Sequence, residues 1–144
     1  MTKIAGPEEI VAHYEDCFRR HGDSHLGVDW PDRSGAERRY RSMLAPARRA
    51  KDPVLHDYGC GLGHLLSFMR RGGANPGFDY SGSDASPVFV DACAAKFPDV
   101  EFQNLTFDHG IFKFRSPDSR YQFLVANGVF TEKLTLSDSA MWEY

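Results

Sequence analysis

The stretch that decides the fold is P-V-L-H-D-Y-G-C-G-L-G, from Pro53 to Gly63, followed about twenty residues later by Y-S-G-S-D, which ends at Asp84. A short apolar run leads into an acid and three alternating glycines, and a second strand-like run closes on a carboxylate. Glycine lets the backbone turn sharply and lets a ligand approach closely. A carboxylate at the tip of the next strand can accept hydrogen bonds from a ribose diol. The stretch therefore predicts a nucleoside-binding half-site.

The spacing of the glycines indicates which nucleoside is bound. Gly59, Gly61 and Gly63 form G-x-G-x-G, whereas a helix N-terminus that holds a pyrophosphate is typical of G-x-G-x-x-G. With D-Y-G-C-G-L-G at 57–63 and Asp84 downstream, the sequence resembles the class I S-adenosylmethionine-dependent methyltransferases of the small-molecule type.

The resemblance extends beyond the glycine motif, from roughly Tyr14 to Phe130. Y-Q-F-L-V-A-N-G-V-F at 121–130 looks like the family's fourth-strand segment, and H-G-D-S-H-L-G-V-D-W at 21–30 is similar to N-terminal segments of some small-molecule methyltransferases. The family resemblance implies S-adenosylmethionine as cofactor and methyl transfer to a small-molecule acceptor.

The fold class expected is α/β, a Rossmann-like parallel sheet flanked by helices with an N-terminal helical extension, because strands and helices alternate along the chain. We expect one domain over 1–144, with a helical cap at 1–51 and a cofactor-binding α/β core at 52–144. The expected helices cover about 7–20, 34–45, 61–71 and 86–97, and the expected strands 53–57, 78–84, 100–103 and 121–126.

About four strands are readable, whereas the resemblance implies seven. We therefore expect a C-terminally truncated chain whose fourth strand is an exposed edge. An unpaired apolar strand invites pairing with another chain, so a homodimer through this edge is the other interpretation.

Composition excludes several classes of protein. A net charge of −3 over 144 residues gives no electrostatic reason to expect nucleic acid or a membrane surface as partner. Cys17, Cys60 and Cys93 are an odd, scattered set without C-x-x-C spacing, which favours reduced thiols and disfavours disulfides or a zinc site. No signal peptide or membrane-spanning stretch is readable, so we expect a cytoplasmic protein.

The resemblance places the cofactor on particular residues. Asp57 is expected to hold its ammonium end, and the three glycines to pass beside the methionine chain. Asp84 would accept hydrogen bonds from the ribose hydroxyls. The remaining cofactor contacts expected are Ala85 and Ser86 beside the adenine, either Asn104 or Asp108 on the adenine amine, and Asn127, with Ala126 and Gly128, near the transferable methyl.

Other residues have two interpretations each. Tyr14 and Trp30 are candidates for a lid over the cofactor, although packing explains such aromatics equally well. Arg38 or Arg39 could meet the methionine carboxylate, although a solvated helix face is the simpler interpretation.

No catalytic base and no metal site are identified. His64 follows the third glycine and could be near the site. His56, inside a strand, has the features of a satisfied core histidine. His109 is expected in a turn. None of these histidines has a metal-ligand spacing, and Cys60 is interpreted as a buried filler.

Two rival functions stay open. The first is a non-catalytic, incomplete methyltransferase fold that binds a cofactor or another protein. The second is a nicotinamide-dependent oxidoreductase, which the glycine spacing and the lack of a Tyr-x-x-x-Lys pair disfavour.

Overall fold

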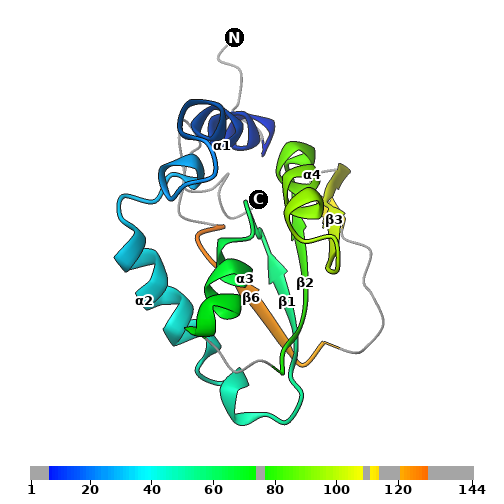
Figure 1. Cartoon of the computed structure of the whole chain (residues 1–144). Helices are drawn as coiled ribbons and strands as arrows, with labels where there is room; N and C mark the ends of the chain where they lie inside the picture. The colour runs from blue at the N-terminus through cyan, green and yellow to red at the C-terminus, as the bar shows by residue number, and fades with distance from the viewer. Residues whose placement is uncertain (1–6, 74–76, 109–110, 114–120, 130–144) are drawn as a thin grey trace.

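The chain forms a parallel sheet covered by helices (Figure 1). The structure, a computed structural model, describes residues 7–73, 77–108, 111–113 and 121–129. Within these residues no helix is both long enough and apolar enough to cross a membrane. The helices are α1 (Pro7–His21), η1 (Leu26–Val28), α2 (Arg33–Leu44), η2 (Ala47–Arg49), α3 (His64–Phe68), η3 (Met69–Gly73) and α4 (Pro87–Lys96). The strands are β1 (Val54–Tyr58), β2 (Asp79–Asp84), β3 (Glu101–Asn104), β4 (Thr106–Asp108), β5 (Ile111–Lys113) and β6 (Phe123–Ala126).

The four long strands form one sheet in the order β3-β2-β1-β6, and every pair in it is parallel. The chain runs from β1 outward through β2 to β3 and then returns to pair β6 with the other side of β1. This reversal creates a switch point between β1 and β6, where ligands bind in open α/β sheets at the carboxyl ends of the strands. The expected α/β fold class is confirmed.

The N-terminal helices begin and end where their sequence predicts. Helix α1 starts at Pro7 with two acids in its first turn and finishes on three basic residues, a distribution that complements the helix dipole. Helix α2 starts after Asp32, whose carboxylate accepts a 2.6 Å hydrogen bond from the Gly35 N–H. Figure 1 shows α1 lying across the carboxyl ends of the strands and α2 running alongside α3.

The helix after the glycine motif is shorter than expected. A start near Gly61 was predicted, but α3 begins at His64 because Gly59, Gly61 and Gly63 all have positive φ angles and cannot continue a helix. The helix ends in the η3 turn, where Gly72 has a φ of +91°. The β4–β5 hairpin, which is antiparallel, was not expected from the sequence.

One face of the sheet carries the apolar core. Leu55, Tyr80 and Val125 point to this face and pack with side chains from α2 and α3, including Leu44 and Leu66. Side chains alternate between the two faces of a strand, so neighbouring positions point the other way.

His56 lies on the opposite face of the sheet. It is fully buried, and its two ring nitrogens lie 2.9 Å from Ser81 Oγ and 2.8 Å from Ser83 Oγ. Tyr121 stacks on its ring, with 4.8 Å between the centroids. His56 is a satisfied core histidine, as one interpretation of the sequence has it.

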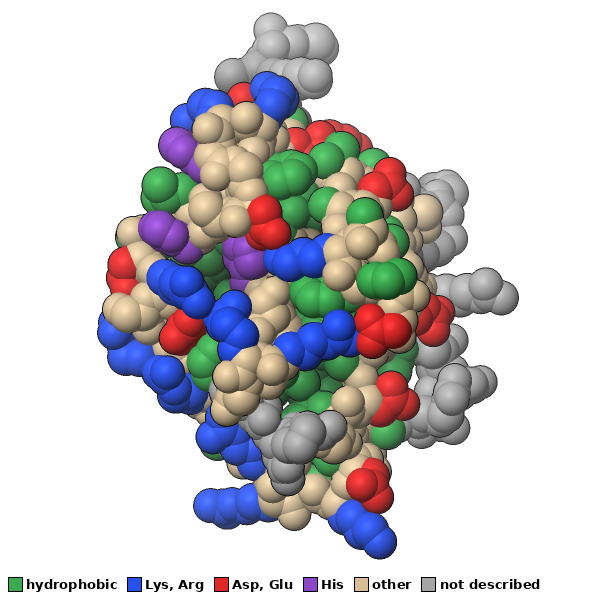
Figure 2. Space-filling view, in the orientation of Figure 1, with side chains coloured by type: hydrophobic (Ala, Val, Ile, Leu, Met, Phe, Trp, Pro, Cys, Tyr) green, Lys and Arg blue, Asp and Glu red, His purple; other side chains and the backbone are tan. Residues whose placement is uncertain are grey.

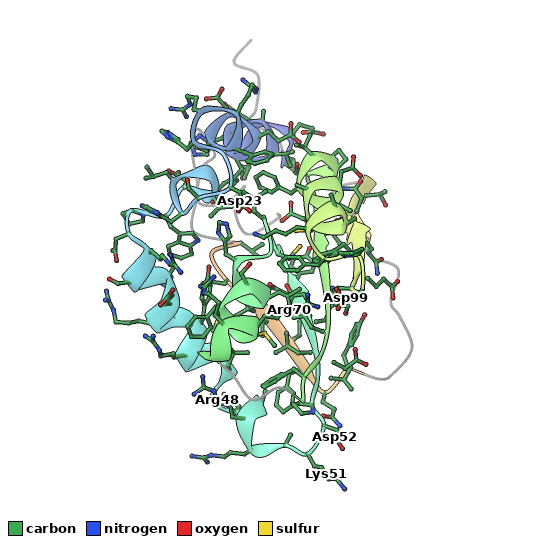
Figure 3. All side chains as sticks on the ribbon, in the orientation of Figure 1. Asp23, Arg48, Lys51, Asp52, Arg70 and Asp99 are labelled. Carbon is green, nitrogen blue, oxygen red and sulfur yellow. The ribbon has the colours of Figure 1, made fainter. Side chains whose placement is uncertain are left out.

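Ion pairs at the surface connect side chains from different elements of the fold. Arg70 pairs with Asp99 at 2.5 Å, which joins η3 to the loop before β3 (Figure 3). Asp23 accepts a hydrogen bond from Lys96 of α4, and its Oδ1 lies 2.7 Å from His64 Nε2. Lys and Arg side chains also gather over α2 and η3 (Figure 2), where Glu37 pairs with three of the arginines.

Candidate cofactor site

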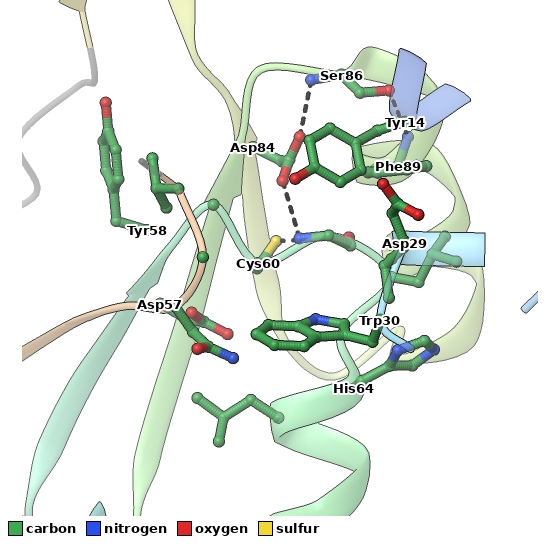
Figure 4. Close-up of a pocket in the computed structure, with 18 of the residues that line it drawn as sticks. Tyr14, Asp29, Trp30, Asp57, Tyr58, Cys60, His64, Asp84, Ser86 and Phe89 are labelled. Atoms are coloured by element: carbon green, nitrogen blue, oxygen red, sulfur yellow. Dashed lines mark hydrogen bonds between the residues drawn. The ribbon is translucent and has the colours of Figure 1, made fainter. Parts of the chain in front are cut away.

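A cavity of about 270 Å³ lies at the carboxyl ends of β1, β2 and β6 (Figure 4). Its floor is formed by the loops that follow these strands, and α1 and residues 28–31 cover it. The volume is close to the lower end of that found for small-molecule sites, roughly 300 Å³. The predicted residues that line it are Asp57, Gly59, Gly61, Asp84, Ala85, Ser86 and Asn127.

The glycine loop is held by backbone hydrogen bonds to β2. The N–H groups of Gly59 and Cys60 both donate to the Ser83 carbonyl, at 2.8 and 2.9 Å. A β-carbon on Gly59 would lie 2.5 Å from Val129 Cγ2, so this position has no room for a side chain. Glycine at this position lets Val129 pack against the loop, and Gly59 and Gly61 add no side chain to the cavity that they line.

Gly63 faces away from the cavity and serves packing instead. Its φ is +69°, and a β-carbon there would lie 2.8 Å from Phe97 Cε2 and 3.3 Å from Cys93 Sγ. Gly63 is not one of the residues that line the cavity. Contact of Gly63 with the cofactor stays a prediction, and the structure gives this glycine a steric role.

Asp84 occupies the end of β2 and joins two loops. One carboxylate oxygen accepts from the Gly61 N–H at 2.8 Å, and the other accepts from the Ser86 N–H at 2.9 Å. Burial raises the pKa of Asp84, and these backbone N–H groups oppose the rise. Each oxygen keeps acceptor capacity, because a carboxylate offers about four lone-pair sites. The geometry fits a diol-binding carboxylate.

Asp57 is only 2% exposed, at the floor of the cavity. Among the described residues its side chain accepts a hydrogen bond from the Tyr80 hydroxyl, which donates to Oδ2 at 2.7 Å. Burial raises the pKa of Asp57 to about 7, and the Tyr80 hydrogen bond works against that rise. A buried carboxylate with one donor is a suitable partner for a ligand cation, because an unpaired buried charge is costly.

Ser86 connects the site to α1. It caps α4 by accepting from the Phe89 N–H, and its hydroxyl donates to Glu15 Oε1 at 2.6 Å. The sequence predicted the cap but not the partner on α1. Phe18 of α1 also meets Phe89 edge to face, with 5.8 Å between the ring centroids. These contacts fasten α1 over the β2–α4 loop.

The two residues proposed for the adenine amine lie differently. Asn104 is outside the cavity lining, and its amide donates to the carbonyls of Asp84 and Ala85 at 3.0 and 3.1 Å. Asp108 ends β4, and its side chain lies outside the described part of the structure. A contact of either residue with adenine stays a prediction. Two apolar residues that the sequence analysis did not select, Phe89 and Leu105, line the cavity near Ala85.

Tyr14 and Trp30 both line the cavity, as the lid interpretation expects (Figure 4). Arg39 lies over the Trp30 ring, 4.9 Å from its centroid, and also reaches the lining. Arg38 instead donates to Ser34 Oγ on its own helix and is exposed. Of the two arginines considered, the structure brings Arg39 to the cavity.

Two further titratable groups, His64 and Cys60, line the cavity. His64 lines the cavity and is 2.7 Å from Asp23, and burial lowers its pKa. Cys60 is buried, and its pKa is raised by the hydrogen bond with Cys93 and by burial, which fits the filler interpretation. All three cysteines are free. His109 lies outside the described residues.

Asp29 is a lining residue that the sequence analysis missed. It has a left-handed backbone, with φ 57° and ψ 33°, and its carboxylate lies 2.8 Å from His13 Nε2. The signal that could have found this pair is the acid in G-V-D-W at 27–30, next to Trp30.

Comparison with known proteins places the fold. No protein-family model and no curated protein matches the sequence. The TehB-like SAM-dependent methyltransferase from Corynebacterium glutamicum is similar in structure, with a TM-score of 0.53 and 21% identity over 90% of this chain and 61% of that one. The [4+2]-cyclase SpnF gives 0.59 and 18% over 85% and 50%, and the sugar N-methyltransferase KedS8 from Streptoalloteichus gives 0.51 and 17% over 90% and 45%.

These similarities show that the chain has the Rossmann-like fold of the SAM-dependent methyltransferases. The sequence resemblance and the structure therefore agree on the fold. The chain spans between 45% and 61% of the length of these three similar chains.

Proposed function

We propose that this chain binds S-adenosylmethionine in the cavity above β1, β2 and β6 and takes part in methyl transfer to a small-molecule acceptor. The observation that carries the proposal is the Asp84 carboxylate, fixed at the end of β2 by the N–H groups of Gly61 and Ser86 and open to the cavity. Two fixed carboxylate oxygens suit the two hydroxyl groups of a ribose. The glycine loop beside them lets the methionine chain of the cofactor run along the loop backbone.

The other lining residues suit the rest of the cofactor. Buried Asp57 provides a negative partner for the ammonium group, and Gly59 and Gly61, which line the cavity, place no side chain between the loop backbone and the methionine chain. Phe89 and Leu105 offer apolar surface for the adenine ring. In this proposal the methyl group faces its acceptor beside Asn127, which directly follows β6 and lines the cavity.

The main task of the protein in this reaction is to align the acceptor with the methyl group. Methyl transfer is an in-line displacement at the carbon bound to the sulfonium: the acceptor's electron pair forms the new bond and sulfur keeps the electrons of the broken one. Holding acceptor and methyl in line supplies a large part of such an acceleration. A general base is required only for a poorly ionised acceptor.

The first test is calorimetric titration of the purified chain with S-adenosylhomocysteine, with NADH as the control ligand. Binding of S-adenosylhomocysteine alone, with micromolar affinity, supports the proposed site and rejects the nicotinamide alternative. Binding of NADH in preference, or of neither ligand, contradicts it.

A second candidate function is cofactor binding without methyl transfer. It is favoured by the structural similarity to SpnF, whose name describes a [4+2]-cyclase rather than a methyltransferase. The two functions differ in turnover. Incubation with S-adenosylmethionine and a small-molecule extract gives S-adenosylhomocysteine and a product heavier by one methyl group under the first, and neither under the second.

A homodimer through β6 belongs to the same proposal. In the described residues β6 pairs with β1 on one side only, and an open edge favours pairing with a second copy. Sedimentation velocity over a range of concentrations distinguishes a dimer from a monomer.

A further inference from the structure

Three side chains of different metal-binding types meet between α1 and the turn that follows η1. His13 and Cys17 lie one helical turn apart on the same face of α1, and Asp29 follows η1 directly. His13 Nε2 lies 2.8 Å from Asp29 Oδ2 and 3.9 Å from Cys17 Sγ. All three ligand atoms are within 4.8 Å of one another.

We propose that His13, Cys17 and Asp29 form a site for a divalent transition-metal cation, with Zn²⁺ as the best match. Imidazole, thiolate and carboxylate are the ligands of zinc, at about 2.0–2.3 Å from the metal. A tetrahedral arrangement at those lengths separates the nitrogen from the sulfur by about 3.6 Å and from the oxygen by about 3.3 Å. The observed 3.9 and 2.8 Å differ from these separations by roughly half an ångström.

Charge and access both suit such a cation. A thiolate and a carboxylate neutralise its two positive charges, and the imidazole is neutral. Cys17 is 3% exposed, whereas the side chains of His13 and Asp29 are 29% and 42% exposed. The metal would therefore reach the buried sulfur from the solvent side, with a water molecule at its fourth position. Binding expels the thiol proton to solvent, and lone pairs of the sulfur, the imidazole nitrogen and a carboxylate oxygen form the three new bonds.

One cation faces the site and has to move. Arg20 Nη2 lies 3.6 Å from Cys17 Sγ. The Arg20 side chain is 56% exposed, and its Nε is already 2.7 Å from Asp16 Oδ2. Because Asp16 holds Arg20 on the solvent side, the guanidinium can withdraw from the sulfur and keep an ion-pair partner.

The backbone at Asp29 gives the arrangement its shape. A left-handed conformation is unfavourable for most residues, and here it is held by the hydrogen bond from the Asp29 N–H to the Leu26 carbonyl. The side chain is directed back to His13 as a result. Asp29 and Tyr14, the neighbour of His13, line the candidate cofactor cavity, so a bound metal would fasten α1 to the segment that covers this cavity.

The test uses the full chain, kept reduced and freed of metal by a chelator, and titrates it with Co²⁺ and then with Zn²⁺. Co²⁺ is expected to give an absorption band of thiolate-to-metal charge transfer, which Zn²⁺ then removes by displacement. Cys17→Ser should abolish the band. His13→Ala and Asp29→Asn should weaken Zn²⁺ binding by at least about tenfold, since even an outer-shell partner commonly matters that much.

Matched controls separate this site from other thiols and imidazoles. His21→Ala removes an exposed imidazole at the end of α1, and Cys93→Ala removes a thiol elsewhere in the core; both should keep the band and the affinity. His13 is a partly exposed surface residue, so its variant should fold, which circular dichroism checks. No charge-transfer band in the parent chain, a band that survives Cys17→Ser, or unchanged Zn²⁺ affinity in His13→Ala overturns the proposal.

Discussion

The Gly61 N–H donates a 2.8 Å hydrogen bond to the Asp84 carboxylate, across 23 residues of sequence. The contact joins the loop after β1 to the end of β2. The residue proposed to read the ribose is therefore also the residue that shapes the glycine loop. A variant of Asp84 changes both roles at once, and an experiment has to separate them.

For Asp84→Ala we expect weaker S-adenosylhomocysteine binding, on the order of 1.5–3 kcal/mol, because a charge-assisted contact is removed. The ribose role is isolated by comparing S-adenosylhomocysteine with its 2′-deoxy analogue in both proteins. The parent chain should discriminate between the two ligands, and the variant should discriminate much less. Equal discrimination by both proteins would show that Asp84 acts only on the loop.

Asp57 should make cofactor binding depend on pH. Its pKa of about 7 in the free protein, set by burial, means that the carboxyl loses its proton when it meets the ligand's ammonium group. Binding then releases a proton and tightens as the pH rises, by up to about tenfold per unit between pH 5.5 and 7. Calorimetry across this range should show the slope in the parent chain. Asp57→Asn, which cannot ionise, should lose it; a slope that persists in the variant belongs to another group.

His56 should contribute an acid-sensitive term to folding stability. Burial lowers the pKa of His56 to about 4, below its unfolded value of about 6.5. Between these values the unfolded chain binds more protons, so the contribution is complete above pH 6.5 and is lost as the pH falls toward 4.

The measurement is urea unfolding of the parent chain and of His56→Gln from pH 7 to 4.5. The stability advantage of the parent over the variant should shrink by roughly 2–3 kcal/mol on the acidic side. Comparing the two proteins at each pH removes the opposite trend from Asp57, whose raised pKa lowers stability as the pH rises from 4 to 7. A constant difference would mean that His56 has the same pKa in the folded and the unfolded chain.

Gly63 and Gly22 form a matched pair for separating backbone strain from packing. Their φ angles are +69° and +62°, but a β-carbon at Gly22 meets nothing within 4 Å, whereas one at Gly63 would lie 2.8 Å from Phe97. Gly22→Ala should cost about 1–2 kcal/mol of strain alone. Gly63→Ala should add overpacking of about 1–3 kcal/mol. Equal losses in urea unfolding would show that Phe97 yields without cost.

The hydrogen bond between Ser86 and Glu15 should help to hold α1 over the cavity. Ser86 also caps α4, so the change is made at Glu15, which caps nothing in the described structure. Glu15→Ala should weaken S-adenosylhomocysteine binding severalfold and raise its dissociation rate. The reason is that an interaction worth about 1 kcal/mol no longer holds α1 over the cavity. Stopped-flow fluorescence of Trp30, a lining residue, follows the release. Asp16→Ala on the same helix, which faces Arg19 and Arg20, serves as the control.

Much of the fold followed from local signals in the sequence. Pro7 and Ser86–Pro87 mark helix starts, apolar residues mark β1 and β6, and the side chains Leu62, Leu65, Leu66 and Met69 are all buried, as their spacing predicts. Such signals act over a few residues, so they can be read in one dimension. The alternating glycines and the acid at the end of the second strand likewise indicated the cavity before its shape was known.

Tertiary structure decided what depends on distant partners. Only the folded chain shows that Gly63 makes room for Phe97, that Asn104 holds the Asp84 loop and that Ser86 reaches Glu15 on α1. The grouping of His13 and Cys17 with Asp29 also depends on how η1 returns to α1. The physical reason is that the sequence encodes local backbone preference and the alternation of apolar side chains. The partner of a buried polar group is fixed only when separate elements pack together.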